Sequence, residues 1–354
     1  MTPRSVLASE LNGAELSATL AKITRGELVE STHPGIVVVA DVTGRLLATH
    51  GNAEHVAYFR SAAKPFQAVP LVESGAADAF GFGPEELALA CASHDATPAH
   101  QRGVARMLAK IELDEDALRC GVSPPPDPQE AARVTLGLKA PSQLQCECSG
   151  EHAGMLAACL HLDYPLDSYT EPDHPLQRRI REVIAQVLRL DEDDLLIGTD
   201  GCRIPTFAAP LQSFAVAYAT LADPRQAPAG NGRKLAKSLD RLREAMTAHP
   251  VLVGGEQTLD SDIMTLSEGR IVAKLGAEGL LCLAVPERGL GIAIAADDGS
   301  SRALGPAAVA VIEQLELAEP GIVDTLRERH VETVKTFGGE MAGEMCPAFQ
   351  LEVG

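Results

Sequence analysis

The stretch GIVVVADVTGRLLATH, residues 35–50, decides the fold of this chain. Residues 35–40 combine β-branched and small apolar side chains in one continuous run, which predicts a buried strand. Thr43-Gly44 then predicts a tight turn, and residues 45–50 predict a second strand that returns beside the first. The stretch therefore predicts a β-hairpin, and with it a sheet that begins close to the start of the chain.

The middle of the chain is predicted to be helical. Apolar residues recur there at helical spacing, and several stretches open with Pro or acidic residues, which favour a first helical turn. Among them, residues 121–140 carry SPPPDP and are predicted to form an extended or looping segment. The predicted helices cover residues 65–74, 84–91, 98–110, 150–161, 175–188, 211–222 and 232–248.

Strand patterns return towards the C-terminal end. Strands are predicted at residues 270–274, 280–285 and 291–295, followed by a long apolar helix at 301–317 and a last strand near 332–337. This order predicts an α/β (α+β) fold in which residues 1–354 form one catalytic unit. We expect a mixed or antiparallel sheet lobe from about residues 20–60 and 255–354, and a helical lobe from about 61–250. The catalytic residues would then lie where the lobes meet.

The overall composition narrows the classes of function. The chain has 354 residues and a net charge of −19 without a dense basic run, so nucleic acid is not an expected partner. There is no run of eighteen apolar residues, and residues 1–30 lack the apolar core of a signal peptide, so no membrane segment is expected. Several of the eight cysteines lie in apolar stretches and are predicted to be reduced and buried. We therefore expect a cytoplasmic protein.

Ser61 and Lys64 are the first candidates for catalysis. They stand three residues apart at the start of a predicted helix, so their side chains share a face. A buried lysine of lowered pKa can take the proton of a serine hydroxyl and make it a nucleophile. Such a pair also arises by chance, but the chain has only 8 lysines against 22 arginines, and both Lys64 and Lys274 lie in apolar stretches. A strand-end lysine that reaches water is the alternative for Lys274.

Ser93-His94-Asp95 contains the three residue types of a hydrolytic triad. Neighbouring side chains diverge, however, so three consecutive residues cannot form one. Ser93 paired with a remote base such as Lys274 is the better hypothesis. A turn or N-cap cluster before the next helix is the alternative.

The densest polar cluster runs from Cys146 to His152. Cys148, Glu151 and His152 would converge on one side of a first helical turn, and zinc accepts thiolate, imidazole and carboxylate ligands. A fourth group could come from Cys202, which ends a turn pattern at residues 199–202. A reactive or structural thiol pair without metal is the alternative.

Five motifs together resemble a known family. In order they are RSAAKPFQ at 60–67, CASH at 91–94, CSGEHAG at 148–154, GTDGC at 198–202 and KLGAEG at 274–279. They look like the Rhizobium etli type of L-asparaginase, the class 3 or inducible thermolabile class. The resemblance covers about residues 25–302, and five spaced motifs are far more specific than any single one.

The resemblance implies a fold similar to the serine β-lactamases and penicillin-binding enzymes, a homodimer, and hydrolysis of L-asparagine to L-aspartate and ammonia. Ser61 would be the nucleophile and Lys64 its base, with Ser93 and Lys274 as a second pair that relays protons. The resemblance also implies substrate-binding residues and a zinc site. These fall on Arg60, His94, Asp200 and Glu278 for the substrate, and on Cys148, Cys202 and Glu151 for zinc, with Cys146 or His152 as additional ligands.

Two departures from the family keep other functions open. Glu151 stands where the family has lysine, and residues 255–262 (GEQTLDSD) stand where it usually has an arginine. One alternative is therefore a glutaminase or another amidohydrolase on the same scaffold. A β-lactamase-like activity is disfavoured because the chain lacks both a secretory signal and Ser-Asp-Asn. A non-catalytic protein that binds an amino acid or a metal is the third alternative.

Overall fold

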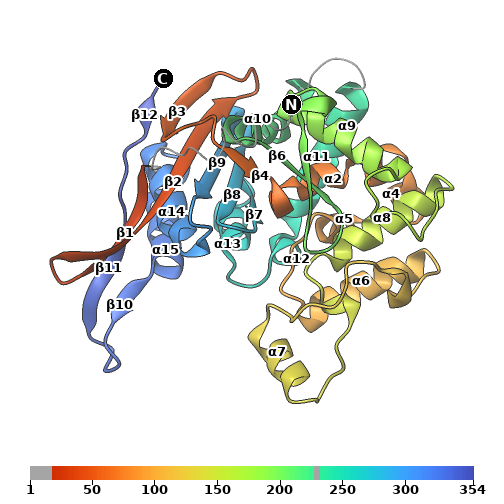
Figure 1. Cartoon of the computed structure of the whole chain (residues 1–354), viewed down its shortest axis with the longest axis horizontal. Helices are drawn as coiled ribbons and strands as arrows, with labels where there is room; N and C mark the ends of the chain where they lie inside the picture. The colour runs from red at the N-terminus through yellow and green to blue at the C-terminus, as the bar shows by residue number, and fades with distance from the viewer. Residues whose placement is uncertain (1–17, 227–231) are drawn as a thin grey trace, which may run out of the picture.

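The computed structural model describes residues 18–226 and 232–354, and its largest element is an antiparallel sheet (Figure 1). Nine of the strands in these residues belong to it, in the order β10-β11-β1-β2-β9-β8-β7, with β3 beside β2 and β12 beside β3. The strands are β1 (Thr19–Arg25), β2 (Leu28–Asp41), β3 (Leu46–His50), β7 (Val272–Gly276), β8 (Leu280–Val285), β9 (Leu290–Ala296), β10 (Thr333–Lys335), β11 (Met341–Pro347) and β12 (Glu352–Val353). The predicted α/β (α+β) class with an antiparallel sheet is confirmed.

The long strand β2 has two different surroundings. Its first half pairs with β1 and is largely exposed, whereas residues 35–41 pair with β9 and residues 37–40 also pair with β3. The predicted hairpin of β2 and β3 is confirmed. Its turn is held by Asp41, whose Oδ1 accepts the N–H of Thr43 at 2.7 Å and of Arg45 at 3.2 Å.

Helices cover both faces of the sheet at β9, where residues 291–296 are all buried. Helices α10 (Leu211–Ala222) and α14 (Leu304–Gln314) both pack on this strand. At Gly291 a Cβ atom would lie 1.8 Å from the carbonyl oxygen of Ala215, so only glycine allows α10 to approach so closely.

The middle of the chain forms a helical part beside a small antiparallel sheet. The small sheet contains β4 (Val56–Tyr58), β6 (Pro205–Pro210) and β5 (Leu196–Thr199), which were not predicted. Four predicted helices have the observed bounds: α6 (Pro98–Lys110), α9 (Pro175–Leu188), α10, and α11 (Gly232–Ala248). Two more differ by one residue, α5 (Pro84–Ala90) and α8 (Ser149–His161). Among the described helices, none is long and apolar enough to cross a membrane.

Other elements differ from the prediction. The single helix expected at 65–74 is the short series η1 (Arg60–Ala63), α2 (Lys64–Gln67) and α3 (Val69–Glu73). Helices α4 (Ala76–Ala79), α12 (Pro250–Val253), α13 (Leu259–Leu266) and α15 (Pro320–His330) were not predicted.

The segment 121–140 is not wholly irregular, so that prediction was wrong. It contains α7 (Pro128–Thr135), which projects from the body of the molecule (Figure 1). The same residues that suggested a loop start this helix. Asp127 caps it by accepting the N–H of Glu130 at 2.8 Å, and Pro128 occupies the first helical position. Glu130 is buried and accepts hydrogen bonds from Gln101 and Lys139, which fasten α7 to α6.

Candidate active site

Ser61 lies in η1, a short helix that packs against β7. Arg60, the residue before it, has a φ of +46°, in the left-handed region that residues with side chains rarely adopt. The surroundings hold this backbone in place: Phe59 stacks on Phe214 with ring centroids 4.2 Å apart, and the Tyr218 hydroxyl donates to the carbonyl of Ala62 at 2.8 Å. Helix α10 therefore fixes the position of the predicted nucleophile.

Lys64 is buried and makes three hydrogen bonds. Its Nζ donates to the carbonyl of Ala92 at 2.6 Å, to Ser93 Oγ at 2.8 Å and to Cys148 Sγ at 3.2 Å. An ammonium group has three N–H donors, so this environment suits the charged form. Among the described residues, none forms a hydrogen bond with the Ser61 hydroxyl. Lys64 thus joins the second predicted serine, Ser93, to the cysteine motif.

The pKa of Lys64 is not lowered, contrary to the expectation for a base. Burial alone would lower it, but the negative charges that Cys148 and Glu151 can carry raise this pKa well above its usual value. Glu151 Oε2 lies 3.5 Å from Nζ. Lys64 is therefore an ammonium in this arrangement and must lose a proton before it can accept one.

Lys274 on β7 is the lysine whose pKa is lowered. It is fully buried, and burial is the main cause, opposed by the carboxylate of Asp260. Lys274 Nζ donates to the carbonyl of Leu275 at 2.9 Å and lies 3.7 Å from Asp260 Oδ2. The alternative of a strand-end lysine that reaches water is wrong.

Asp260, on α13, is a functional candidate that the sequence analysis missed. It is buried, and its carboxylate accepts the hydroxyl of Thr258 at 2.9 Å and the N–H groups of Ser261 and Leu275 at 3.0 and 3.1 Å. These bonds hold it beside Lys274. The only signal in the sequence was its place within the segment 255–262, where the chain departs from the family.

Ser93 and His94 lie in a loop fastened on both sides. The N–H of Ser93 donates to the carbonyl of Val253 at 2.9 Å. His94 Nδ1 accepts the N–H of Ala96 at 3.1 Å, so Nε2 carries the proton and donates to Ser149 Oγ at 2.9 Å. Burial lowers the pKa of His94 well below its usual value, which keeps the ring neutral. His94 therefore joins two motifs, and neither ring nitrogen is free for a substrate.

Cys148, Glu151 and Cys202, the three zinc ligands that the family resemblance implied, converge in the structure. Their ligand atoms all lie within 4.8 Å of one another, and all three side chains are buried. Within the described residues neither carboxylate oxygen of Glu151 has a hydrogen-bond partner, and burial raises the pKa of Glu151 to about 7. Two thiols and a carboxylate are ligands that zinc accepts, so these residues fit a zinc ion.

The two additional ligand candidates lie outside this group of three. Cys146 Sγ donates to the backbone carbonyl of Cys120 at 3.8 Å, and the neighbouring Cys120 thiol raises the pKa of Cys146 to about 12. His152 is buried, and its Nδ1 lies 2.7 Å from the hydroxyl of Tyr169. Among the described residues, Nε2 of His152 has no hydrogen-bond partner.

Arg60 and Asp200 form a paired charge at the edge of the site. Arg60 donates from Nε and Nη2 to the two carboxylate oxygens of Asp200, both at 3.0 Å. Arg60 also lines a pocket of about 270 Å³ together with Glu278 and His55. Of the four predicted substrate-binding residues, Arg60 and Glu278 therefore line one pocket. Asp200 orients Arg60, and His94 does not line this pocket.

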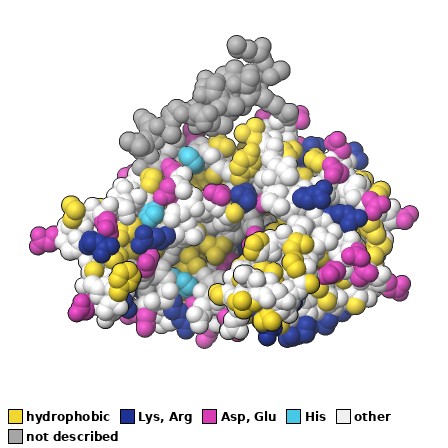
Figure 2. Space-filling model, turned by 60° about the horizontal axis from the view of Figure 1, so that its bottom comes forward, with side chains coloured by type: hydrophobic (Ala, Val, Ile, Leu, Met, Phe, Trp, Pro, Cys, Tyr) yellow, Lys and Arg dark blue, Asp and Glu magenta, His cyan; other side chains and the backbone are white. Residues whose placement is uncertain are grey.

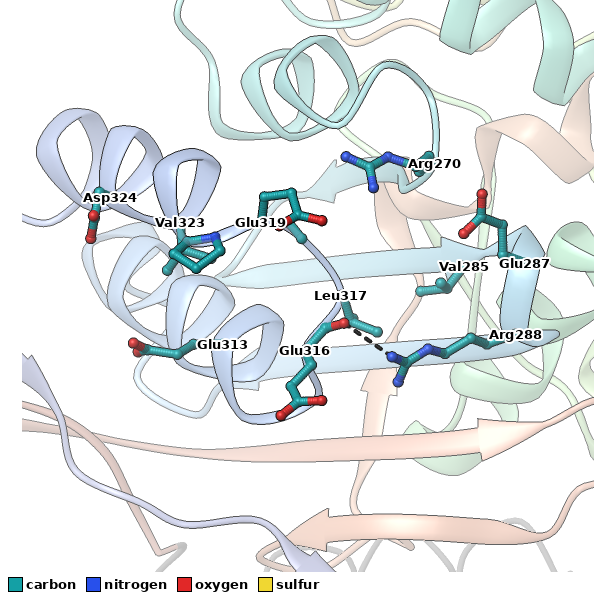
Figure 3. Close-up of a pocket in the computed structure, with 12 residues that line it drawn as sticks. Arg270, Val285, Glu287, Arg288, Glu313, Glu316, Leu317, Glu319, Val323 and Asp324 are labelled. Carbon is teal, nitrogen blue, oxygen red and sulfur yellow. Dashed lines mark hydrogen bonds between the residues drawn. The ribbon is translucent and has the colours of Figure 1, made fainter.

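A second pocket lies far from these residues in the fold, between β8–β9 and the connection of α14 to α15 (Figure 3). It has a volume of about 430 Å³. Arg288 points into it and donates to the carbonyls of Leu315 and Glu316, which follow α14, so it satisfies backbone acceptors at the C-terminal end of this helix. None of the predicted site residues lines this pocket.

The sequence matches the family described as L-asparaginase II over residues 21–347. The chain belongs to this family. The family that the five motifs predicted is therefore confirmed, and with it an amidohydrolase, an enzyme that acts on a small-molecule substrate. No curated protein matches this L-asparaginase II family member.

Solved structures similar to this L-asparaginase II family member share little sequence with it. Mglu in its glutamate form has 17% identity and a TM-score of 0.42, covering 88% of this chain and 67% of its own. A β-lactamase from Mycobacterium bovis has 12% identity and a TM-score of 0.37, covering 84% and 94%. A putative β-lactamase from Bacteroides dorei has 13% identity and a TM-score of 0.40, covering 88% and 98%.

Proposed function

We propose that this enzyme hydrolyses the side-chain amide of L-asparagine through a covalent intermediate on Ser61. The observation that carries the proposal is the position of Lys64, one turn after Ser61 in a family motif and 2.8 Å from Ser93 Oγ. In this proposal Ser61 and Ser93 act in one site together with two buried lysines, Lys64 and Lys274. The catalytic residues would lie between a sheet lobe and a helical lobe of a single unit.

In the proposed reaction Ser61 Oγ attacks the amide carbon and its proton passes to Lys64. Lys64 must first lose its own proton. Ser93, which already accepts a hydrogen bond from Nζ, is the first group on that route, and Lys274, with its lowered pKa, is the next. The C–N bond then breaks, and ammonia leaves with the proton that Lys64 returns. Water hydrolyses the resulting ester to L-aspartate.

The charged ends of the substrate would be held in the pocket lined by Arg60, the residue before Ser61. Arg60 offers a guanidinium for the α-carboxylate, and Glu278 offers a carboxylate for the α-ammonium. Asp200 keeps Arg60 oriented by two hydrogen bonds. A glutaminase activity would use the same groups, so both amides are compared in the test below.

Cys148, Cys202 and Glu151 would hold zinc. When bound there, the ion supplies a positive charge that can bind a substrate oxygen and polarise it. Glu151 supplies the charge that compensates both the metal and the nearby ammonium of Lys64. We also propose that the enzyme is cytoplasmic and forms a homodimer.

The test is ammonia release from L-asparagine and L-glutamine by the wild type, Ser61→Ala and Ser93→Ala. We expect Ser61→Ala to lower kcat at least about 10³-fold, because the nucleophile is lost. Ser301→Ala, an exposed serine in a 3₁₀ turn, is the matched control and should keep full activity. Full activity of Ser61→Ala would overturn the proposal, and a loss confined to Ser93→Ala would make Ser93 the nucleophile. Substrate binding without turnover in the wild type would favour the non-catalytic alternative.

A further inference from the structure

Two hairpins project side by side from one end of the sheet (Figure 1). One joins β1 to β2 and the other joins β10 to β11. They are paired almost to their tips, where the N–H of Gly26 donates to the carbonyl of Ala342 at 2.9 Å. We call this four-stranded projection, residues 22–31 and 333–346, the arm.

The tip of the arm is apolar. Leu28 and Met341 are 72% and 71% exposed, Val29 is 45% exposed and Phe337 is fully exposed. Single exposed apolar residues are normal on a surface, but four of them on two adjacent turns form a patch. Hydrophobic side chains are visible at the left end of the molecule in Figure 2, among charged ones. Nothing in the fold of one described chain uses these side chains.

A groove lies between the base of the arm and helices α14 and α15. It has a volume of about 770 Å³. Its walls include apolar groups from both sides, among them Val309, Ala310, Val331, Met345 and Pro347. Five acidic and two basic residues also line the groove. The same face of the molecule thus carries an apolar projection and a recess whose walls are partly apolar.

This pairing of features fits a second copy of the chain better than another partner. In a two-fold dimer the same patch is used by both copies, so a projection and its recess must lie on one face. The arm has three basic and four acidic residues, a charge of −1, and the groove is lined by five acidic and two basic residues, a charge of −3. Only a small part of the −19 of the chain therefore lies at the proposed contact. β10 is also the edge strand of the nine-stranded sheet, and within the described residues no strand pairs with its outer edge, which can therefore meet another strand.

We propose that two copies of the enzyme associate through their arms, with the Phe337 tip of each copy seated in the groove of the other. This assigns the surface for the homodimer proposed above and rests on that part of the proposed function. Burying one aromatic side chain removes about 150–250 Å² from water, and a stable interface needs about 800 Å² per partner. The rest of this area would come from the other three tip residues and from the walls of the groove.

The first test is sedimentation velocity on the full chain over a range of concentrations. We expect the wild type to be a dimer and Phe337→Glu to raise the dimer dissociation constant at least about 100-fold, since a central aromatic is lost twice in each dimer. Leu138→Glu is the matched control: it adds the same charge at an apolar residue that is 75% exposed but lies outside the arm. A monomeric wild type, or a Phe337→Glu variant that dimerises as well as the control, would overturn the proposal.

The second test identifies the recess. Cys346 is a free cysteine that lines the groove. With copper phenanthroline as oxidant, Gly338→Cys, which leaves Phe337 in place, should form a cross-linked dimer on a non-reducing gel. Gly338→Cys with Cys346→Ser should lose that cross-link. A cross-link that persists without Cys346 would place the tip elsewhere and overturn the seating in the groove. Ammonia release is measured separately, so a failure of the interface is distinguishable from a failure of the proposed catalysis.

Discussion

Replacing Asp260 by Asn tests whether the charge beside Lys274 controls the reaction. Asp260 Oδ2 lies 3.7 Å from Nζ, and both side chains are buried. Two unit charges at about 4 Å interact by about 4 kcal/mol at the effective dielectric constant typical of such sites. Removing one partner of a buried pair costs about 3–5 kcal/mol of folding stability, because the other charge is left uncompensated.

The direction in which Asp260→Asn shifts the pH profile follows from the two causes that set the pKa of Lys274. Burial lowers this pKa and Asp260 raises it, so Asp260→Asn lowers it further. If Lys274 must be neutral to accept a proton, the rise of kcat/KM with pH should move to lower pH. The loss of stability should shrink as pH rises through the lowered pKa that Lys274 has in the folded wild type, because a neutral Lys274 no longer forms an ion pair with Asp260.

The measurements are the pH profile of ammonia release and urea denaturation at several pH values. Asp262→Asn is the control, since Asp262 lies on the same helix and is buried, but pairs with Arg329 and His330. It should lose stability without moving the pH profile. If Asp260→Asn leaves the profile where it was, Lys274 does not titrate in the reaction and the proposed proton route is wrong.

Three further predictions address the metal, the substrate and the fold. Glu151→Gln should weaken zinc binding at least about tenfold in competition with a chelating dye, whereas Glu147→Gln, an exposed neighbour, is the control. Wild-type zinc affinity in Glu151→Gln would exclude Glu151 as a ligand. Arg60→Lys should raise KM for L-asparagine about tenfold or more with a smaller effect on kcat, because lysine cannot form the two-point contact; an unchanged KM would remove Arg60 from the substrate site. Asp127→Ala should cost about 1 kcal/mol of unfolding free energy in urea, and no change would show that its bond to Glu130 does not stabilise α7.

Local sequence patterns were sufficient to predict most of the long helices and central strands. The bounds of α6 and α9 follow from a proline at the first position and from apolar residues at helical spacing. Two other strands were harder to predict. β1 carries Lys22 and Arg25 among its apolar residues, and β6 both begins and ends with proline. Each lies between two pairing partners, one near and one distant in sequence, and this pairing determines them.

The site residues also divide into those that local sequence patterns predict and those that they do not. The motifs placed Ser61, Lys64, Cys148 and Cys202, and the structure brings Lys64 and both cysteines together. Asp260 could not be identified from its own surroundings, because an acidic residue in a polar segment normally faces water. Its contact with Lys274 depends on α13 packing against β7, and no local pattern reports that.

The continuity of β2 has a mechanical consequence. A single strand runs from the arm into the middle of the sheet, where β9 and β8 connect it to β7, the strand that carries Lys274. β2 is unbroken along this path, so we expect the arm and the sheet to move as one body. In the proposed dimer, arms of this kind would hold the two active sites at a constant distance and angle throughout turnover. Each active site would then work independently of motion in the other.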